Sequence, residues 1–413
     1  MNFSTPQDAY ALMNSLVKQA QAVNAPTVVD LSTFVDAGSA VMSTGNENVL
    51  NSLSILIGKT IISSRPYKAK MGLIEARDGN MYSNRLRKIT YYPRYNREAG
   101  FVNTNLHADN IVNGRDTSTG VGDMWEINLP IVAETNFGGR YVWDRSDTTL
   151  LDQIKVAFRG PDEFNAFING KMTELNNDIE QTKEAKNRIA ILNHAAGIMN
   201  MVENGNLGKE CAVNLTAEFN KEYGTKYTTD QILQEHIDDY LKWWAARVQL
   251  DSNKLTHRTE KYHYGLPKQV DGNTLNLLRH TPKDKQKFIY YNPMLIMAKA
   301  RVLPEIFNPQ YITEQNGEGV DYWQSFDDPQ AIRVKPSIPV GESKEIVIPK
   351  LVGMLFDEDA LITHYDLDSV YTTPIEARKC LYNTWYHYAQ STFDDFTENG
   401  IIYYMADDAE VSP

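Results

Sequence analysis

Cysteine is almost absent from this chain, and several other features that would assign it to a class are missing too. Its 413 residues include two cysteines, Cys211 and Cys380, which give no disulfide framework and suit a reducing compartment. No apolar run approaches the roughly eighteen residues that a membrane-spanning helix needs, and the N-terminus has no secretory signal. The sequence therefore predicts neither a membrane protein nor a disulfide-stapled secreted domain.

Catalytic signatures are also missing. The chain has no Gly-x-Ser-x-Gly elbow and no Cys-x-x-Cys motif. Residues Ile57–Thr60 resemble the end of a phosphate-binding loop, but Leu53 stands where that motif needs its first glycine. Adjacent acids such as Asp394 and Asp395 point to opposite sides of a strand, so they do not form an acid–base pair.

The eight histidines are scattered and give no complete set of metal ligands. His236 stands beside Glu235 and one helical turn from Asp239, but no third ligand is placed by spacing, and an exposed helix face explains the pattern better. We therefore expect that this protein is not an enzyme and that it holds no cofactor and no metal. A hydrolase in the middle of the chain is the enzymatic alternative.

Positive charge is scarce overall but concentrated in one place. The chain has 41 Lys and Arg against 53 Asp and Glu, a net charge of −12, which argues against a dedicated nucleic-acid-binding protein. Residues 65–98 carry nine basic residues and three acids, so this segment is +6 and the remainder is −18. A basic arm on an acidic body suits self-association in which the arm docks on a neighbouring copy. The candidate contact residues are Lys68, Lys70, Arg77, Arg85, Arg87, Lys88, Arg94 and Arg97.

The same segment leaves a second reading open. Five tyrosines interleave with its cations, as in surfaces on which single-stranded bases stack. Salt-dependent binding of oligonucleotides to residues 65–98 would favour this alternative. If the arm instead serves self-association, reversing the charge at Arg85, Arg87 and Lys88 should abolish assembly and leave a folded monomer.

The first part of the chain predicts helices followed by an extended excursion. A helix opens at Thr5-Pro6 and runs toward Asn24, and Val41–Thr60 is helical in part. Residues 66–143 are rich in Gly, Asn, Arg and Tyr, with strand-like pieces at Leu86–Tyr92 and Met124–Val132. We expect a long two-stranded arm there, which needs a body to lie on. Thr149 can cap a short helix that ends by Phe158.

The next segment predicts an unusually long helix. Pro161–Asn204 has no internal proline, and its apolar residues recur at spacings of three and four. One continuous helix of this length reaches about 66 Å. Gly170 and Gly197 could bend it, and two helices broken near Asn176-Asn177 are the alternative.

The middle and the end of the chain predict mixed structure. Thr228–Gln231 resembles a capping box that opens a helix through Trp244. Phe288–Asn292 reads as a strand, Pro293 starts a helix, and Asn308–Pro339 reads as irregular. Aromatic residues are about twice as frequent between residues 354 and 405 as in the whole chain. The strand expected there has aromatics on both faces, with Leu381, Trp385 and Ala389 on one and Tyr382, Tyr386 and Tyr388 on the other. We therefore expect it to be covered on both faces and the closing segment to be a core element.

In this order the elements resemble the major capsid proteins of tailed bacteriophages, which have the Hong Kong 97-type fold, and most closely the variant of small short-tailed phages of the phi29 kind. The stretches that carry the resemblance are Ile55–Ile62, Pro66–Trp143, Asp144–Phe158, Pro161–Asn204, Phe356–Leu361, Leu381–Tyr388 and Ile401–Met405. They resemble, in turn, the apolar segment before the extended loop, the loop, the short helix after it, the spine helix and the closing strands.

The resemblance implies an α+β fold in five parts. These are an N-terminal arm with helices (1–65), an extended loop (66–143), a peripheral domain with the spine helix (144–205), an axial domain (206–349) and return strands that complete the peripheral domain (350–413). Some members of the family crosslink a loop lysine to a neighbour's asparagine, but nothing singles out one lysine here, and we predict no crosslink.

The resemblance also implies a function. The chain would be a major capsid (head) protein that assembles as hexamers and pentamers into an icosahedral or prolate shell around the double-stranded DNA genome of a phage. Its partners would be itself, a separate scaffolding protein, a portal protein and, through weak non-specific contact, the packaged DNA. It would be found in the virion after assembly in the cytoplasm of the host bacterium. An encapsulin-like nanocompartment shell is the alternative within the same fold.

Overall fold

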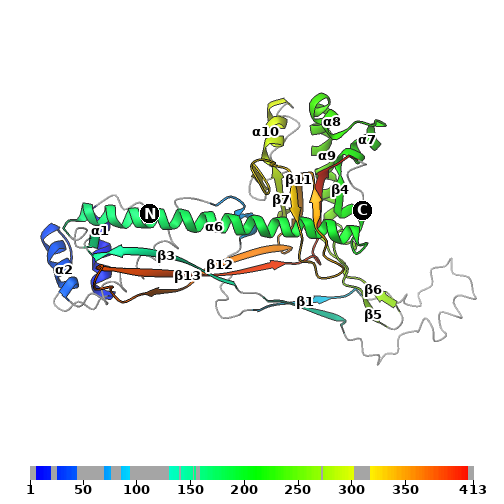
Figure 1. The fold of residues 1–413 in the computed structure, drawn as a ribbon. Helices are drawn as coiled ribbons and strands as arrows, with labels where there is room; N and C mark the ends of the chain where they lie inside the picture. The colour runs from blue at the N-terminus through cyan, green and yellow to red at the C-terminus, as the bar shows by residue number, and fades with distance from the viewer. Residues whose placement is uncertain are drawn as a thin grey trace, which may run out of the picture.

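A computed structural model describes residues 6–19, 26–43, 69–75, 85–93, 130–138, 141–151, 153–154, 159–270, 273–301 and 317–407. One long helix, α6 (Pro161–Glu203), forms the axis of the molecule. A five-stranded sheet stands above the C-terminal end of α6, and a three-stranded sheet runs beneath the helix along its length (Figure 1). The α+β fold class expected from the sequence is confirmed.

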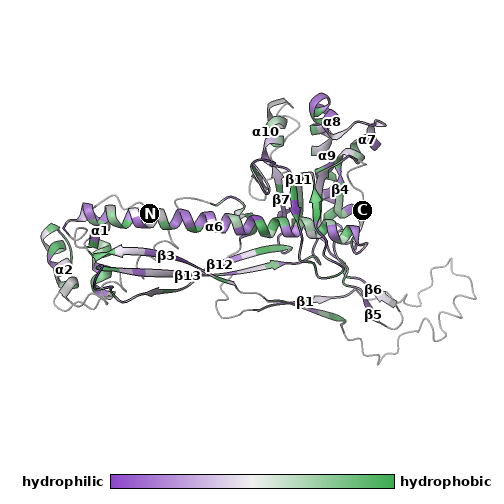
Figure 2. Ribbon diagram, in the orientation of Figure 1, coloured by the Kyte–Doolittle hydropathy of each residue, from purple (hydrophilic) through white to green (hydrophobic). Residues whose placement is uncertain are grey.

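Helix α6 is unbroken over 43 residues, about 64 Å, so the prediction of a continuous helix is confirmed and the two-helix alternative is wrong. Pro161 occupies its first turn, where a missing N–H is harmless, and Asp162 and Glu163 complement the helix dipole. The first half of the helix alternates between hydrophilic and hydrophobic residues, whereas the end near the five-stranded sheet is more uniformly hydrophobic (Figure 2). The C-terminal part of α6 is therefore a core helix.

The two glycines of α6 have opposite roles. Nothing lies within 4 Å of the place where a Cβ at Gly170 would stand, whereas a Cβ at Gly197 would overlap the ring of Phe396. We expect Gly170→Ala to raise the free energy of unfolding by about 0.5–1 kcal/mol through helix propensity. Gly197→Ala should lower it by about 1–2 kcal/mol, because overpacking outweighs the same gain. Urea denaturation of both variants tests this pair, and a stabilised Gly197→Ala would contradict it.

The three-stranded sheet has the order β12-β13-β3, with strands β12 (Leu361–Thr372), β13 (Leu381–Asp394) and β3 (Tyr141–Leu150). Its inner face packs on α6 and on the N-terminal helices α1 (Pro6–Gln19) and α2 (Leu31–Ser43). The buried aromatic residues of this face are Trp143, Tyr382, Tyr386 and Tyr388.

Two expectations fail in this sheet. Trp385 is 37% exposed on the outer face of β13, so the prediction that both faces of this strand are covered is wrong within the single chain. The helix expected over Asp144–Phe158 is also wrong as far as Leu150, because β3 extends through these residues. The reason is tertiary: β3 pairs with β13 continuously from Tyr141 to Leu150. Among the described residues that follow β3, Leu151 and residues 153–154 are helical, in agreement with the short helix that Thr149 was expected to cap.

The five-stranded sheet has the order β4-β14-β11-β7-β8 and contains both ends of the closing segment. Its strands are β4 (Ala212–Asn214), β7 (Gln286–Tyr291), β8 (Gly317–Val320), β11 (Lys350–Asp357) and β14 (Gly400–Met405). Every residue of β14 is buried, so the expectation that the closing segment is a core element is confirmed. Residues 350–407 thus divide between the two sheets, with β11 and β14 in one and β12 and β13 in the other.

Helices cover the far end of the five-stranded sheet (Figure 1). They are α7 (Leu215–Tyr223), α8 (Thr229–Glu235), α9 (Ile237–Leu255) and α10 (Asn292–Arg301). The capping box of Thr228 and Gln231 is confirmed, but the helix that it opens breaks at His236, which separates α8 from α9. The stretch Asn308–Pro339, which was expected to be irregular, contains β8 and β9 (Ile332–Val334). Strand β9 pairs with β10 (Ile346–Ile348).

A two-stranded hairpin, β1 (Arg85–Tyr91) with β2 (Val132–Gly138), lies below the three-stranded sheet, on the side away from α6 (Figure 1). A small pair, β5 (Lys268–Val270) and β6 (Asn273–Leu275), lies near its end. The strand expected at Leu86–Tyr92 is confirmed. Most of the second expected strand, Met124–Val132, lies outside the described residues, as does the apolar stretch Ile55–Ile62. Within the described part of the chain, no helix is both long and apolar enough to cross a membrane.

Candidate functional site: the hairpin and its anchor

Three of the basic residues singled out from the sequence have described side chains: Lys70, Arg87 and Lys88. Arg85 belongs to β1, but only its backbone is described. The other candidates, Lys68, Arg77, Arg94 and Arg97, lie outside the described residues. The site can therefore be built from the β1–β2 hairpin and the groups that it contacts.

The two faces of the hairpin differ in chemistry because strand residues alternate in direction and directly opposed residues share a face. Tyr91 is opposite Val132, Ile89 is opposite Glu134, and Arg87 is opposite Asn136. We call the face formed by Arg87, Ile89, Tyr91, Val132, Glu134 and Asn136 the outer face, since all six residues are exposed. The residues between them, which include Lys88, Thr90 and Tyr92, are half-buried or buried.

The outer face combines apolar side chains with one ion pair. Ile89, Tyr91 and Val132 are 48%, 63% and 42% exposed, and they adjoin one another in the register of the hairpin. Arg87 forms an ion pair of 2.8 Å with Glu134 on the same face. Contiguous exposed apolar residues with a charged rim are typical of a surface that binds another protein.

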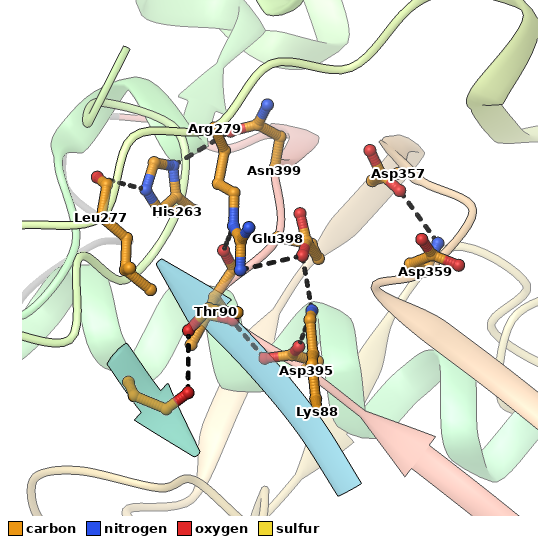
Figure 3. A network of polar contacts seen from close by, with 12 residues as sticks. Lys88, Thr90, His263, Leu277, Arg279, Asp357, Asp359, Asp395, Glu398 and Asn399 are labelled. Atoms are coloured by element: carbon orange, nitrogen blue, oxygen red, sulfur yellow. Dashed lines mark hydrogen bonds and ion pairs between the residues drawn. The ribbon is translucent and has the colours of Figure 1, made fainter. Parts of the chain in front are cut away.

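The inner face is tied to the body through Lys88 (Figure 3). Its Nζ forms ion pairs with Asp395 and Glu398, and Arg279 approaches Glu398 from the other side at 3.2 Å. The side chains of Lys88, Asp395 and Glu398 are 23%, 5% and 10% exposed. We call these four residues the anchor. Two cations and two carboxylates balance in charge, as nearly buried charges must.

Hydrogen bonds to neighbouring groups hold the anchor in place (Figure 3). Asp395 Oδ1 accepts from the backbone N–H of Thr397 at 2.9 Å, and the Nε of Arg279 donates to the carbonyl of Thr397 at 3.1 Å. Asn399 lies next along the chain and contacts His263, with 3.1 Å between Asn399 Oδ1 and His263 Nδ1. The anchor is therefore a preorganised site and not a loose surface contact.

Burial shifts the protonation of two of these groups. Burial raises the pKa of Glu398 above its usual range, although Lys88 and Arg279 act in the opposite direction. Burial lowers the pKa of His263, and the nearby charge of Arg279 adds to this. The raised pKa means that the ionised form of Glu398 is costly to bury, so its two cationic partners are needed to hold it in place.

A second contact lies at the end of β1. Tyr92 donates from its hydroxyl to the carbonyl of Leu266 at 2.7 Å and packs on Leu275 and Leu277. Lys268 Nζ donates to the carbonyl of Val132 at 3.0 Å, so both strands of the hairpin are held here. Burial raises the pKa of Tyr92, which keeps its hydroxyl a donor.

The comparisons with known proteins concern the fold. No family model matches the sequence, and no curated protein matches it. A chain in the capsid structure of Staphylococcus phage Andhra is similar in structure, with 12% identity and a TM-score of 0.50, over 82% of this chain and 85% of that one. A chain in the structure of the head fiber and inner core protein gp22 of native bacteriophage P68 has 11% identity and a TM-score of 0.48, over 82% and 85%. The chain has the Hong Kong 97-type fold.

Elements of the Hong Kong 97-type fold can be compared with those described above. Helix α6 lies where the resemblance implied the spine helix, and the β1–β2 hairpin lies within residues 66–143, which the resemblance assigned to the extended loop. The division of the chain into domains at residues 65, 143, 205 and 349 stays a prediction.

Two of the three described basic residues form ion pairs with parts of their own chain outside the hairpin. Lys88 belongs to the anchor, and Lys70 forms an ion pair with Asp321. We therefore expect the reversal of Lys88 together with Arg85 and Arg87 to disturb the subunit itself, and the prediction that this triple change leaves a folded monomer stays a prediction. The outer-face residues Ile89, Tyr91 and Val132 were not singled out from the sequence, although the alternation of β1 already separated them from Lys88.

Proposed function

We propose that this chain is a major capsid protein that assembles into the closed shell of a tailed phage. The observation that carries the proposal is the exposed apolar outer face of a hairpin on a Hong Kong 97-type fold. Fold alone does not determine function, but the exposed side chains of Ile89, Tyr91 and Val132 on this face offer an apolar surface for a neighbouring copy.

The outer face of the three-stranded sheet offers a second exposed surface. Val142 and Leu150 of β3, Trp385 of β13 and Tyr371 of β12 are exposed there, and Trp385 lies opposite Tyr371 and Ser146 in the register. A hairpin of one copy on the sheet of the next would be a heterologous contact. Such contacts repeat around a ring and close it, which is what hexamers and pentamers require.

The packaged DNA would be contacted weakly and without sequence preference. Three of the four cations of the spine helix form ion pairs within the chain: Lys171 lies 2.8 Å from Asp147, Lys183 lies 3.0 Å from Glu180 and Arg188 lies 2.9 Å from Glu184. Arg145 of the adjacent strand likewise pairs with Asp178 at 2.7 Å. Paired cations release few counterions on binding phosphate, so affinity for DNA should be low. The same pairing of Arg87 and Lys88 gives no support to the single-stranded nucleic-acid alternative.

The remaining partners belong to the same proposal. A closed shell of one repeated subunit needs a vertex for genome entry and a means of reaching a uniform size. We therefore include a portal protein and a separate scaffolding protein as partners, assembly in the host cytoplasm, residence in the virion and a non-enzymatic role.

Light-scattering mass after size exclusion, with negative-stain imaging of the same peak, tests the proposal. Megadalton closed particles or regular sheets are the expected result, alone or with a scaffolding protein from the same source. A monomer under both conditions would overturn it.

A further inference from the structure

Two short connectors join the two sheets of this chain, residues 358–360 between β11 and β12 and residues 395–399 between β13 and β14, and we call the second one the connector. On one side the connector is held by the C-terminal part of the spine helix, which also packs on the five-stranded sheet. Asp394 contacts His194 Nδ1 and accepts from Asn193 Nδ2, each at 2.6 Å, and the ring of Phe396 stacks on His194 with 5.0 Å between centroids. Because Gly197 leaves no room beside Phe396, the connector has little freedom to shift along α6.

The other side of the connector belongs to the five-stranded sheet. The N–H of Gly400 donates to the carbonyl of Tyr262 at 2.9 Å, and Tyr262 packs in the core between this sheet and α9. Asn399 donates to Thr281 at 3.0 Å, and Thr281 donates to Asp357 of β11 at 2.6 Å. The segment around residues 262–281 therefore moves with the five-stranded sheet.

The hairpin spans this joint. Phe137 of β2 packs edge-on against Phe393 at the end of β13, with 6.1 Å between ring centroids, so this contact belongs to the three-stranded sheet. Tyr92 at the other end of the hairpin is bonded to Leu266 and packs on Leu277, which belong to the segment fixed to the five-stranded sheet. Between the two contacts, Lys88 is bound to Asp395 and Glu398 of the connector itself.

We propose that the hairpin is a strap across the joint between the two sheets, with the Lys88 anchor as its central fastening. A two-stranded ribbon that is attached on both sides of a joint restrains the angle at the joint, and a change in that angle must move the ribbon. Whatever docks on the outer face of the hairpin is therefore coupled to the angle between the sheets. The strap is a property of a single chain and does not depend on the proposed shell function.

The matched pair Lys88 and Arg87 makes the strap testable. These neighbours have the same charge and lie on the same strand, but Lys88 contacts the connector and Arg87 contacts Glu134 within the hairpin. Lys88→Met should widen the range of angles between the two sheets, and Arg87→Met should leave that range unchanged. Lys88→Arg, which keeps the positive charge, should also keep the range of the parent chain.

Spin labels on either side of the joint measure its angle. Cysteines at the exposed positions Ser146 of β3 and Leu250 of α9 would carry the labels in a Cys380→Ser background. Cys211 is buried, which raises the pKa of its thiol to about 12, so it should stay unlabelled. Dilution with unlabelled chain confines the measured distances to one molecule, whether free or assembled.

Pulsed electron–electron double resonance should give a narrow distribution of label-to-label distances for the parent chain and for Arg87→Met. For Lys88→Met the distribution should be at least twofold wider. If Lys88→Met does not yield folded protein, Glu398→Gln, which removes one partner and keeps its shape, decides the question by the same comparison. Equal widths in the parent chain and the anchor variant would overturn the strap. Equal broadening by Arg87→Met would also overturn it, because it would reflect general loosening of the hairpin.

Discussion

We expect that replacing Ile89 and Tyr91 together by serine abolishes the proposed assembly into particles and leaves a folded monomer. Both side chains are about half exposed or more, so the monomer loses little packing when they are truncated. At an interface, each anchor of this kind contributes about 2 kcal/mol or more. Two of them weaken every contact roughly 1000-fold, and a shell repeats that contact many times. Size exclusion with light scattering reads the result directly.

The matched control replaces two residues of similar exposure elsewhere. Tyr223 and Leu250 are about half exposed on α7 and α9, away from the hairpin. The variant with both Tyr223→Ser and Leu250→Ser should therefore still form particles of normal size. Particles of normal size from the hairpin variant would show that its outer face is not a contact surface.

The largest effect on stability is expected at Asn187, where Asn187→Leu lowers the free energy of unfolding by about 4 kcal/mol. The Asn187 side chain is fully buried in α6 and links two other parts of the chain. Its Nδ2 donates to the carbonyl of Met71 at 3.1 Å and to Glu75 at 2.9 Å. Its Oδ1 accepts from Thr363 at 2.9 Å and from Tyr365 at 2.7 Å. Leucine fills a similar volume but leaves several buried polar groups without partners, at about 1–3 kcal/mol each.

Asn177→Leu on the exposed side of the same helix is the control, and it should change the free energy of unfolding by no more than about 0.5 kcal/mol. Chemical denaturation followed by far-ultraviolet circular dichroism gives both values. A loss below about 1 kcal/mol for Asn187→Leu would mean that water replaces the amide.

The long helix and the capping box could be predicted because their causes are local. Proline-free periodicity from Pro161 and the spacing of Thr228 and Gln231 act within a few residues of chain. The assignment of Asp144–Leu150 to a helix is wrong for the opposite reason. Tyr141–Leu150 pairs with β13, which is more than 200 residues later in the chain, whereas the helix that Thr149 was expected to cap is present at Leu151 and residues 153–154.

The closing segment was predicted in its burial but not in how its strands divide between the two sheets. Its aromatic content predicts buried strands, and β14 is buried throughout. Which sheet each strand joins is not written in the composition, since β13 and β14 are separated by a connector of five residues and enter different sheets. The exposed face of β13 around Trp385 similarly depends on what the rest of the chain leaves uncovered.

Local causes in the sequence specify the long helix, the capping box that opens α8, the strand β1 and the aromatic core strands. The sequence by itself also determined the separation of a basic segment from an acidic body. The role of each cation depends on contacts between distant parts of the chain. Lys88 and Asp395 are 307 residues apart in the chain, and no local pattern joins them. Arg87 and Lys88 are chemically alike in the sequence, and only the direction in which the strand turns each side chain makes one a fastening within the subunit and leaves the other on its outer face.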